Sequence, residues 1–217
     1  MLNIASIIDH TLLKPNATYN DFKILCEQAV RYSFCSVCVP PFMVEACKKA
    51  LNNTDVKVCT VVGFPLGYNN YLIKLIEAKQ AIRNGADEID AVINIAALKS
   101  KDFNYIEKEI ALLRKTTLNK VLKIIVETAY LNEDEKEKIA KIILNNNVDF
   151  LKTSTGFAPS GANIEDIKLF KKILKNNVKI KASGGISTYK QAENLIRAGA
   201  GRLGTSKSLQ LIDDGNE

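Results

Sequence analysis

The sequence contains few of the residues from which metal and disulfide sites are usually built. It has one histidine, His10, and five cysteines, an odd number, at scattered positions. Cys35 and Cys38 have C-x-x-C spacing, but residues three apart on a strand point to opposite faces. No second cysteine pair or histidine pair is present to complete four ligands. The composition therefore excludes a disulfide framework and predicts that no metal is bound.

Long apolar runs and blocks of one charge are also missing. No run approaches the roughly 18 apolar residues of a membrane span, and the N-terminal segment lacks the basic leader of a signal peptide. We therefore expect a cytoplasmic protein with no membrane partner. The net charge is +6, but the lysines are dispersed, without an arginine-rich block or interleaved aromatic residues. A solvated lysine surface with one focus for an anionic ligand is favoured over a nucleic-acid binder.

What the sequence does contain is an alternation of short apolar, β-branched runs with helix-like segments. Segment 132–146 begins with Asn132, has Glu135 three residues later as a capping signal, and places its isoleucines on one face. The eight apolar runs are 7–13, 36–40, 56–65, 87–94, 121–128, 148–156, 178–185 and 201–206. This order predicts an α/β protein, a (β/α)8 TIM barrel, with residues 1–217 as a single domain. An open doubly wound sheet is the alternative. No G-x-G-x-x-G follows a strand, so a dinucleotide cofactor is not expected.

Polar residues gather where these strands end, which is where a barrel carries its functional groups. Side chains two apart on a strand share a face, so Asp9 and Thr11 point one way and His10 points the other. We interpret His10 as a packed or hydrogen-bonded structural residue, and Cys38 as a small pocket-wall residue rather than a nucleophile, because it has no histidine partner. The polar residues at the strand ends are Asp9, Thr11, Cys38, Asp90, Asn94, Lys152, Lys181, Gly204, Thr205 and Ser206.

Two lysines at the ends of neighbouring strands indicate covalent chemistry. The runs that end in Lys152 and Lys181 are sixth and seventh in order, and adjacent strands lie about 4.8 Å apart. A cation beside a cation disfavours protonation of one of them, and a neutral amine forms a Schiff base with a carbonyl carbon. Asp90 supplies a carboxylate for proton transfer. For a single lysine, contact with solvent or an ion pair with Asp90 would be the better interpretation, but two adjacent lysines favour catalysis.

The turns after the last two strands indicate an anion site. Ser183–Gly185 and Gly204–Ser206 each lead into a helix-like segment. Barrel enzymes often hold phosphate in these two loops, on backbone N–H groups near a helix N-terminus, and glycine lets the backbone approach the anion. Together the two turns predict a phosphorylated ligand.

The same residues carry a family resemblance. The motifs, in chain order, are IDHTLLKPNAT, VCVPPF, VVGFPLG, GADEIDAVINI, IIVET, LKTSTGF, IKASGGI and RLGTS. They resemble the deoxyribose-phosphate aldolases, class I aldolases on a (β/α)8 barrel, over nearly the whole chain. The resemblance implies reversible cleavage of 2-deoxy-D-ribose 5-phosphate to D-glyceraldehyde 3-phosphate and acetaldehyde, in deoxyribonucleotide catabolism, without metal or cofactor. It also implies that Lys152 forms the Schiff base, Lys181 perturbs it and Asp90 relays protons.

Further expectations concern the substrate-binding wall and the assembly. The predicted substrate-binding residues are Asp9, Thr11, Cys38, Thr155, Gly156, Gly184, Gly185, Gly204, Ser206 and Lys207. Phe157 stands where some members of the family carry a lysine, so that phosphate contact is missing, and Lys207 is positioned to restore a positive charge. The segment after the eighth strand is short, so a tail that closes over the site is not expected. The protein is expected to form a homodimer or a higher homo-oligomer.

Two other enzyme functions are compatible with the same residues. One is a Schiff-base barrel aldolase that acts on a different phosphosugar, which kinetics with deoxyribose 5-phosphate would distinguish. The other is a phosphate-ligand isomerase without a covalent step, which would leave no adduct after borohydride reduction. A non-catalytic nucleic-acid binder is a third and more distant possibility.

Overall fold

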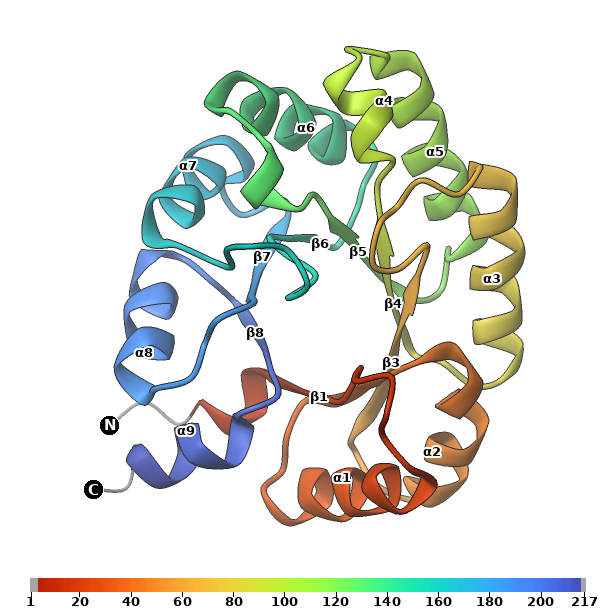
Figure 1. The fold of residues 1–217 in the computed structure, drawn as a ribbon, viewed down its shortest axis with the longest axis vertical. Helices are drawn as coiled ribbons and strands as arrows, with labels where there is room; N and C mark the ends of the chain where they lie inside the picture. Colours follow the sequence, from red (N-terminus) through yellow and green to blue (C-terminus); the bar gives the residue numbers. More distant parts are fainter. Residues whose placement is uncertain (1–3, 216–217) are drawn as a thin grey trace.

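Eight parallel strands close into a barrel in a computed structural model that describes residues 4–215 (Figure 1). Each strand pairs with the next along the chain, and β8 pairs with β1 to close the ring. The strands are β1 (Ile8–Thr11), β2 (Ser36–Val39), β3 (Lys57–Val62), β4 (Glu88–Val92), β5 (Val121–Ile125), β6 (Phe150–Lys152), β7 (Lys179–Ser183) and β8 (Arg202–Thr205). The predicted (β/α)8 barrel is confirmed, and the open doubly wound sheet is excluded.

Helices form an outer ring around the strands (Figure 1). They are α1 (Tyr19–Arg31), α2 (Val44–Ala50), α3 (Tyr71–Arg83), α4 (Ile95–Lys99), α5 (Phe103–Thr116), α6 (Glu133–Asn145), α7 (Ile164–Leu174), α8 (Tyr189–Ala198) and α9 (Ser208–Asp214), with short 3₁₀ turns at Ala5–Ile7, Pro41–Met43 and Thr128–Tyr130. The capping signal before α6 is confirmed, because the Asn132 side chain accepts from the Glu135 backbone amide and the Glu135 side chain accepts from the Asn132 backbone amide. No helix within residues 4–215 is long and apolar enough to cross a membrane.

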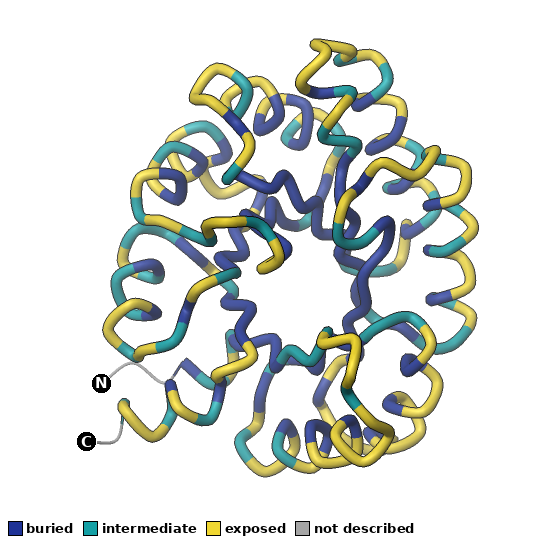
Figure 2. Tube along the Cα trace, viewed as in Figure 1, coloured by how far each residue is buried: buried dark blue, intermediate teal, exposed yellow. Residues whose placement is uncertain are grey.

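Alternation along each strand separates an apolar layer from a polar barrel interior. In β5, Leu122 and Ile124 belong to the apolar core between strands and helices, whereas Lys123 lies between them in sequence and contacts Asp90. The barrel wall forms a buried ring, and exposed residues concentrate on the loops and outer helix faces (Figure 2). A period of two thus sends one set of side chains to the helices and the other to the centre of the barrel.

His10 faces outward, as the alternation of β1 predicts. Its Nδ1 lies 2.9 Å from the Ser208 hydroxyl on α9, and its Nε2 lies 2.9 Å from the Gln28 amide oxygen on α1. The ring also contacts Phe34. The single histidine therefore joins β1 to two helices.

A buried ion pair lies outside the barrel, between two helices. Lys74 of α3 and Glu109 of α5 are fully buried, with Nζ and Oε1 2.6 Å apart. Lys74 also donates to the Val92 carbonyl, and Glu109 accepts from the Asn94 amide. The pair therefore ties two helices to the end of β4.

Candidate active site

A cavity of about 540 Å³ opens at the C-terminal ends of the strands. The loops after β1, β6, β7 and β8 supply its walls. The lining residues that the sequence predicted are Thr11, Lys152, Thr155, Gly156, Gly184, Gly185, Gly204, Ser206 and Lys207. Phe157 and Lys14 also line the cavity, the first at its apolar side and the second as a further cation.

Lys152 is the member of the predicted catalytic trio that lines this cavity. It is the last residue of β6, its side chain is 4% exposed, and its Nζ donates to Oδ2 of Asp90 at 2.9 Å. The strand fixes the backbone of Lys152, and the surrounding core excludes water from most of its side chain. The amine is thus held at the boundary between a dry interior and a substrate-sized space.

Lys181 is the register partner of Lys152 on β7, and both Lys181 and Asp90 are fully buried. Lys181 donates to the same Oδ2 of Asp90 at 2.7 Å and approaches Oδ2 of Asp9 at 2.5 Å. Burial by itself would lower the pKa of Lys181, but the carboxylates of Asp9 and Asp90 outweigh it and raise that pKa above its ordinary value. The two carboxylates thus favour the charged form of Lys181 beside the Lys152 amine.

Asp90 accepts from three lysines. Burial would raise its pKa, but the ammonium groups of Lys123, Lys152 and Lys181 outweigh that effect and hold the pKa well below its ordinary value. Lys123 occupies Oδ1 at 2.8 Å, and the other two share Oδ2. The carboxylate is thus ionised and oriented by contacts on both oxygens.

Lys123 was missed by sequence reasoning. It is fully buried at the centre of β5 and contacts Asp90, Glu88 and, at 3.6 Å, Asp9. One signal was available: Lys123 sits alone between apolar residues in the run VLKIIV, at the position whose neighbours face the helices. A lysine there has to lie inside the barrel.

Arg202 and Glu88 complete the charged interior below these residues and were also missed. The Arg202 guanidinium contacts Oδ1 of Asp9 at 2.6 Å and Oε2 of Glu88 at 3.0 Å. We call the connected set the barrel cluster. It consists of Asp9, Glu88, Asp90, Lys123, Lys152, Lys181 and Arg202.

Two predicted substrate-wall residues lie deeper than expected. Asp9 is fully buried in the barrel cluster, and Cys38 is fully buried beside Cys59 on the paired strand β3, so neither lines the cavity. Thr11, two residues beyond Asp9, does reach the cavity. Position along the strand, and not only its face, decides which residues a ligand can touch.

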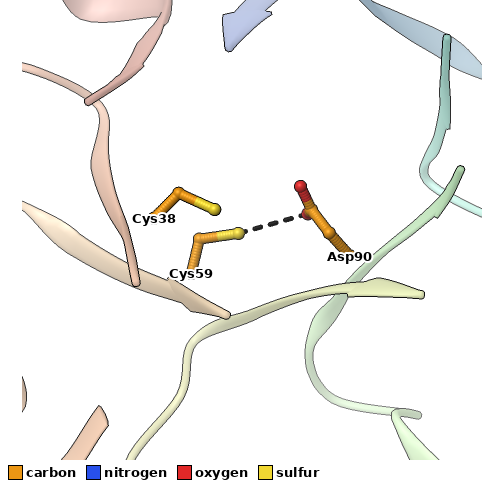
Figure 3. A group of neighbouring side chains, drawn as sticks. All are labelled: Cys38, Cys59 and Asp90. Carbon is orange, nitrogen blue, oxygen red and sulfur yellow. Dashed lines mark hydrogen bonds between the residues drawn. The ribbon is translucent and has the colours of Figure 1, made fainter. Parts of the chain in front are cut away.

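Cys38, Cys59 and Asp90 place three metal-ligand atoms close together (Figure 3). The Cys59 thiol donates to Oδ1 of Asp90 at 3.1 Å, and burial raises the pKa of that thiol well above its ordinary value, with Cys38 and Asp90 adding to the rise. The Lys123 ammonium lies 3.3 Å from the same sulfur. A divalent cation here would face a Cys59 thiol that holds its proton and an ammonium group within 3.3 Å of the same sulfur, so the group suits a hydrogen-bonded wall better than a metal centre.

The glycines of the predicted anion turns have different roles. Gly185 has φ +74° and open space where a side chain would project, so its backbone faces the cavity without obstruction. A Cβ at Gly204 would lie 2.9 Å from Cε of Lys181. Gly204 therefore provides room for Lys181, while Gly185 leaves room for a ligand.

Glu127 anchors the loop that carries the cavity wall after β6, and sequence reasoning did not single it out. Its backbone is left-handed, with φ 55°, and its carboxylate accepts from the amide of Thr155, at 3.2 Å, and from its hydroxyl. Burial raises the pKa of this carboxyl group. Beyond the anchor, Phe157 packs edge-on against Phe64 with ring centroids 5.3 Å apart and remains 55% exposed. The cavity therefore has an apolar wall at Phe157.

Comparison with known proteins identifies a family of aldolases. The model of the DeoC/LacD family of aldolases matches residues 4–206. The deoxyribose-phosphate aldolases of Caldanaerobacter subterraneus subsp. tengcongensis and Clostridioides difficile are 48% and 50% identical over 99% and 98% of this chain, and 94% and 96% of their own lengths are covered. The tetrameric deoxyribose phosphate aldolase of Aeropyrum pernix superposes with a TM-score of 0.90 at 28% identity, covering 99% of this chain and 91% of the other.

Proposed function

This chain belongs to the DeoC/LacD family of aldolases, and from that membership we propose that it reversibly cleaves 2-deoxy-D-ribose 5-phosphate to D-glyceraldehyde 3-phosphate and acetaldehyde, with Lys152 as the Schiff-base residue. The names of its relatives support the substrate. The observation that carries the residue assignment is the position of the Lys152 Nζ, which reaches the cavity while bonded to a carboxylate oxygen that it shares with a second lysine.

The reaction begins with imine formation. The neutral Lys152 amine adds to the aldehyde carbon C1 of the open-chain sugar, and the carbinolamine loses water to give an iminium. Removal of the proton from the C3 hydroxyl then allows the C2–C3 bond to break, which releases glyceraldehyde 3-phosphate. The electron pair of that bond passes to the iminium, so that an enamine remains on Lys152. Protonation of C2 and addition of water free acetaldehyde and the amine.

Asp90 and Lys181 handle the protons in this scheme. Oδ2 of Asp90 lies within hydrogen-bond distance of both amines, so a proton can pass between Lys152 and the carboxylate directly or through a water molecule. Lys181 is too deeply buried to line the cavity and keeps its charge through Asp9 and Asp90. Of the two lysines, Lys152 therefore has the access that a nucleophile needs.

The phosphate is assigned to the turns after β7 and β8. Gly184, Gly185 and Ser206 line the cavity there, and Lys207 and Lys14 place two exposed cations at its rim. They supply positive charge to the cavity, whereas Phe157 in the loop after β6 supplies none. After β8 the chain forms α9, which packs against α8 and β1.

A homo-oligomer is proposed because a relative is described as tetrameric. Its size, dimer or larger, and the cytoplasmic location stay predictions.

Reductive trapping tests the proposed function. Borohydride treatment in the presence of acetaldehyde should add one reduced two-carbon group to Lys152, located by peptide mass spectrometry. A label on Lys181 alone would reverse the assignment of the two lysines. Absence of any adduct, together with isomerase activity on a sugar phosphate, would replace the aldolase with the non-covalent alternative.

A further inference from the structure

Lys123 has no part in the chemistry described above, yet it makes more carboxylate contacts than either catalytic lysine. Its ammonium contacts Glu88, Oδ1 of Asp90 at 2.8 Å and Oδ2 of Asp9 at 3.6 Å. It is fully buried and does not line the cavity. Burying an ammonium group is costly even when it is paired, because the desolvation penalty can exceed the Coulombic gain, so its presence in the centre of the barrel points to a role beyond stability.

We propose that Lys123 is a positioning residue of the aldol reaction, which orients Asp90 by holding Oδ1 and supplies the buried positive charge that favours the neutral form of Lys152. This inference rests on the proposed function. It assigns Lys123 no contact with substrate and no proton transfer.

The first half of the inference follows from how Asp90 divides its contacts. Lys123 and the Cys59 thiol take Oδ1, whereas Lys152 and Lys181 take Oδ2. Lys123 is itself held from below by Glu88, which Arg202 also contacts. Rotation of the carboxylate would break the Lys123 contact, so the oxygen that faces Lys152 stays the same through the reaction.

The second half follows from the charges that surround Lys152. The barrel cluster contains four cations and three carboxylates, and one cation per strand comes from β5, β6, β7 and β8. Among the three lysines, Lys152 has one carboxylate partner, Lys181 two and Lys123 three. A proton leaves Lys152 with the smallest loss of ion pairing.

Other ionisable groups near Lys152 have to be counted as well. The Glu127 carboxylate lies outside the barrel cluster, bound to Thr155, and interacts with Lys152. The thiols of Cys38 and Cys59 line the β2–β3 side. Lys14 and Lys207 stand across the cavity, where water screens them. Of these groups, the Cys59 thiol lies closest to the substituted residues, 3.3 Å from the Lys123 ammonium and within 4.8 Å of the Glu88 carboxylate. Because the two substitutions change the charge in opposite directions, opposite shifts in the two variants report on the barrel cluster.

Two substitutions of opposite sign test the inference. Lys123→Met removes the buried positive charge that contacts Asp90. Glu88→Gln removes the negative charge of Glu88, a partner of Lys123. Trapping of acetaldehyde with cyanoborohydride is followed against pH, because the imine requires neutral Lys152. We expect the trapping midpoint to rise by roughly one pH unit in Lys123→Met and to fall by a similar amount in Glu88→Gln, the scale of one charge several ångströms away at an effective dielectric constant of about 20.

The double variant Lys123→Met/Glu88→Gln restores the balance of charges and should return the midpoint to within a few tenths of a unit of the wild type. Lys74→Met is the matched control, because Lys74 is equally buried and paired with Glu109 but lies outside the barrel. It should lower the melting temperature without moving the midpoint.

The possible outcomes separate the two proposals. If the wild-type protein traps no acetaldehyde on Lys152, the proposed function fails. If it does, and Lys123→Met and Glu88→Gln leave the midpoint where it was or shift it in the same direction, the role of Lys123 is overturned. Should Lys123→Met fail to fold, the downward shift expected of Glu88→Gln decides the question alone.

Discussion

Lys152 and Lys181 are direct partners in the register of β6 and β7, and both donate to Oδ2 of Asp90, at 2.9 and 2.7 Å. Sequence reasoning placed two ammonium groups side by side. In the structure a carboxylate lies between them, and a second carboxylate, that of Asp9, keeps Lys181 charged. The two lysines therefore differ in role. Lys152 lines the cavity and has one ion-pair partner, whereas Lys181 is fully buried and is held in its charged form by two carboxylates.

Lys152→Arg should abolish aldol cleavage. A guanidinium group keeps its proton at any accessible pH and cannot form the imine, although it retains the charge near Asp90. We expect no borohydride-dependent adduct by mass spectrometry and no detectable kcat/KM for deoxyribose 5-phosphate. Persistent acetaldehyde labelling of another lysine, with activity, would show that Lys152 is not the nucleophile.

Lys181→Met should move the activity profile to higher pH. Removing a cation that lies beside Lys152 makes the protonated form of that amine less unfavourable, so less neutral amine is present at pH 7 and imine formation slows. The check is kcat/KM from pH 6 to 10 for wild type and variant. Wild-type activity with an unshifted profile would mean that Lys181 does not tune its neighbour.

Asp90→Asn should separate imine formation from proton transfer. The amide keeps the shape of the carboxylate but cannot accept a proton, so the aldol rate should fall by roughly 100-fold or more, while trapping of acetaldehyde on Lys152 is partly retained. Combined with Lys181→Met, the losses should not multiply, since both residues serve one proton-transfer unit. Full multiplication in the double variant would argue against that unit.

Ser206→Asp should weaken binding of the phosphorylated substrate selectively. A carboxylate in the turn after β8 repels the phosphate, so KM should rise far more for deoxyribose 5-phosphate than for 2-deoxyribose. Ser206→Asn is the matched neutral control and should show little discrimination. Gly185→Asp should act in the same direction, with added backbone strain at φ +74°. Equal losses for both sugars would locate the phosphate elsewhere.

Acid should destabilise the fold through Asp9 and Asp90. In the folded protein burial raises the pKa of each carboxyl group, but the adjacent lysines, with Arg202 at Asp9, outweigh it and leave the pKa depressed. Their contribution is therefore present above the unfolded pKa of about 3.9 and is lost as the pH falls toward the folded values. Each group steepens the fall of the unfolding free energy by up to about 1.4 kcal/mol per pH unit.

Asp9→Asn checks this acid dependence. Denaturant unfolding at a series of pH values from 6 to 3 should give a shallower decline for Asp9→Asn than for the wild type, although the variant is less stable at pH 6. Identical slopes would show that Asp9 is not preferentially ionised in the folded state.

The sequence by itself determined the barrel and the residues at its mouth. Eight short apolar runs that alternate with helix-like segments predict strands covered by helices, and Lys152, Gly185 and Ser206 lie at or just after strand ends because the runs stop there. Local pattern is sufficient for such features, since hydrophobic periodicity and turn chemistry act between neighbours in the chain.

Only the tertiary structure decided which charges meet inside the barrel. Lys179 and Lys181 share one face of β7, yet Lys179 is exposed at the start of the strand and Lys181 is fully buried. Asp90 meets Lys152 and Lys181 across 62 and 91 residues of sequence, because the curvature of the closed barrel turns the inner faces of β4, β6 and β7 toward its centre. Depth within the barrel and partners across it depend on the stagger of all eight strands, and a repeat of two residues carries no information about either.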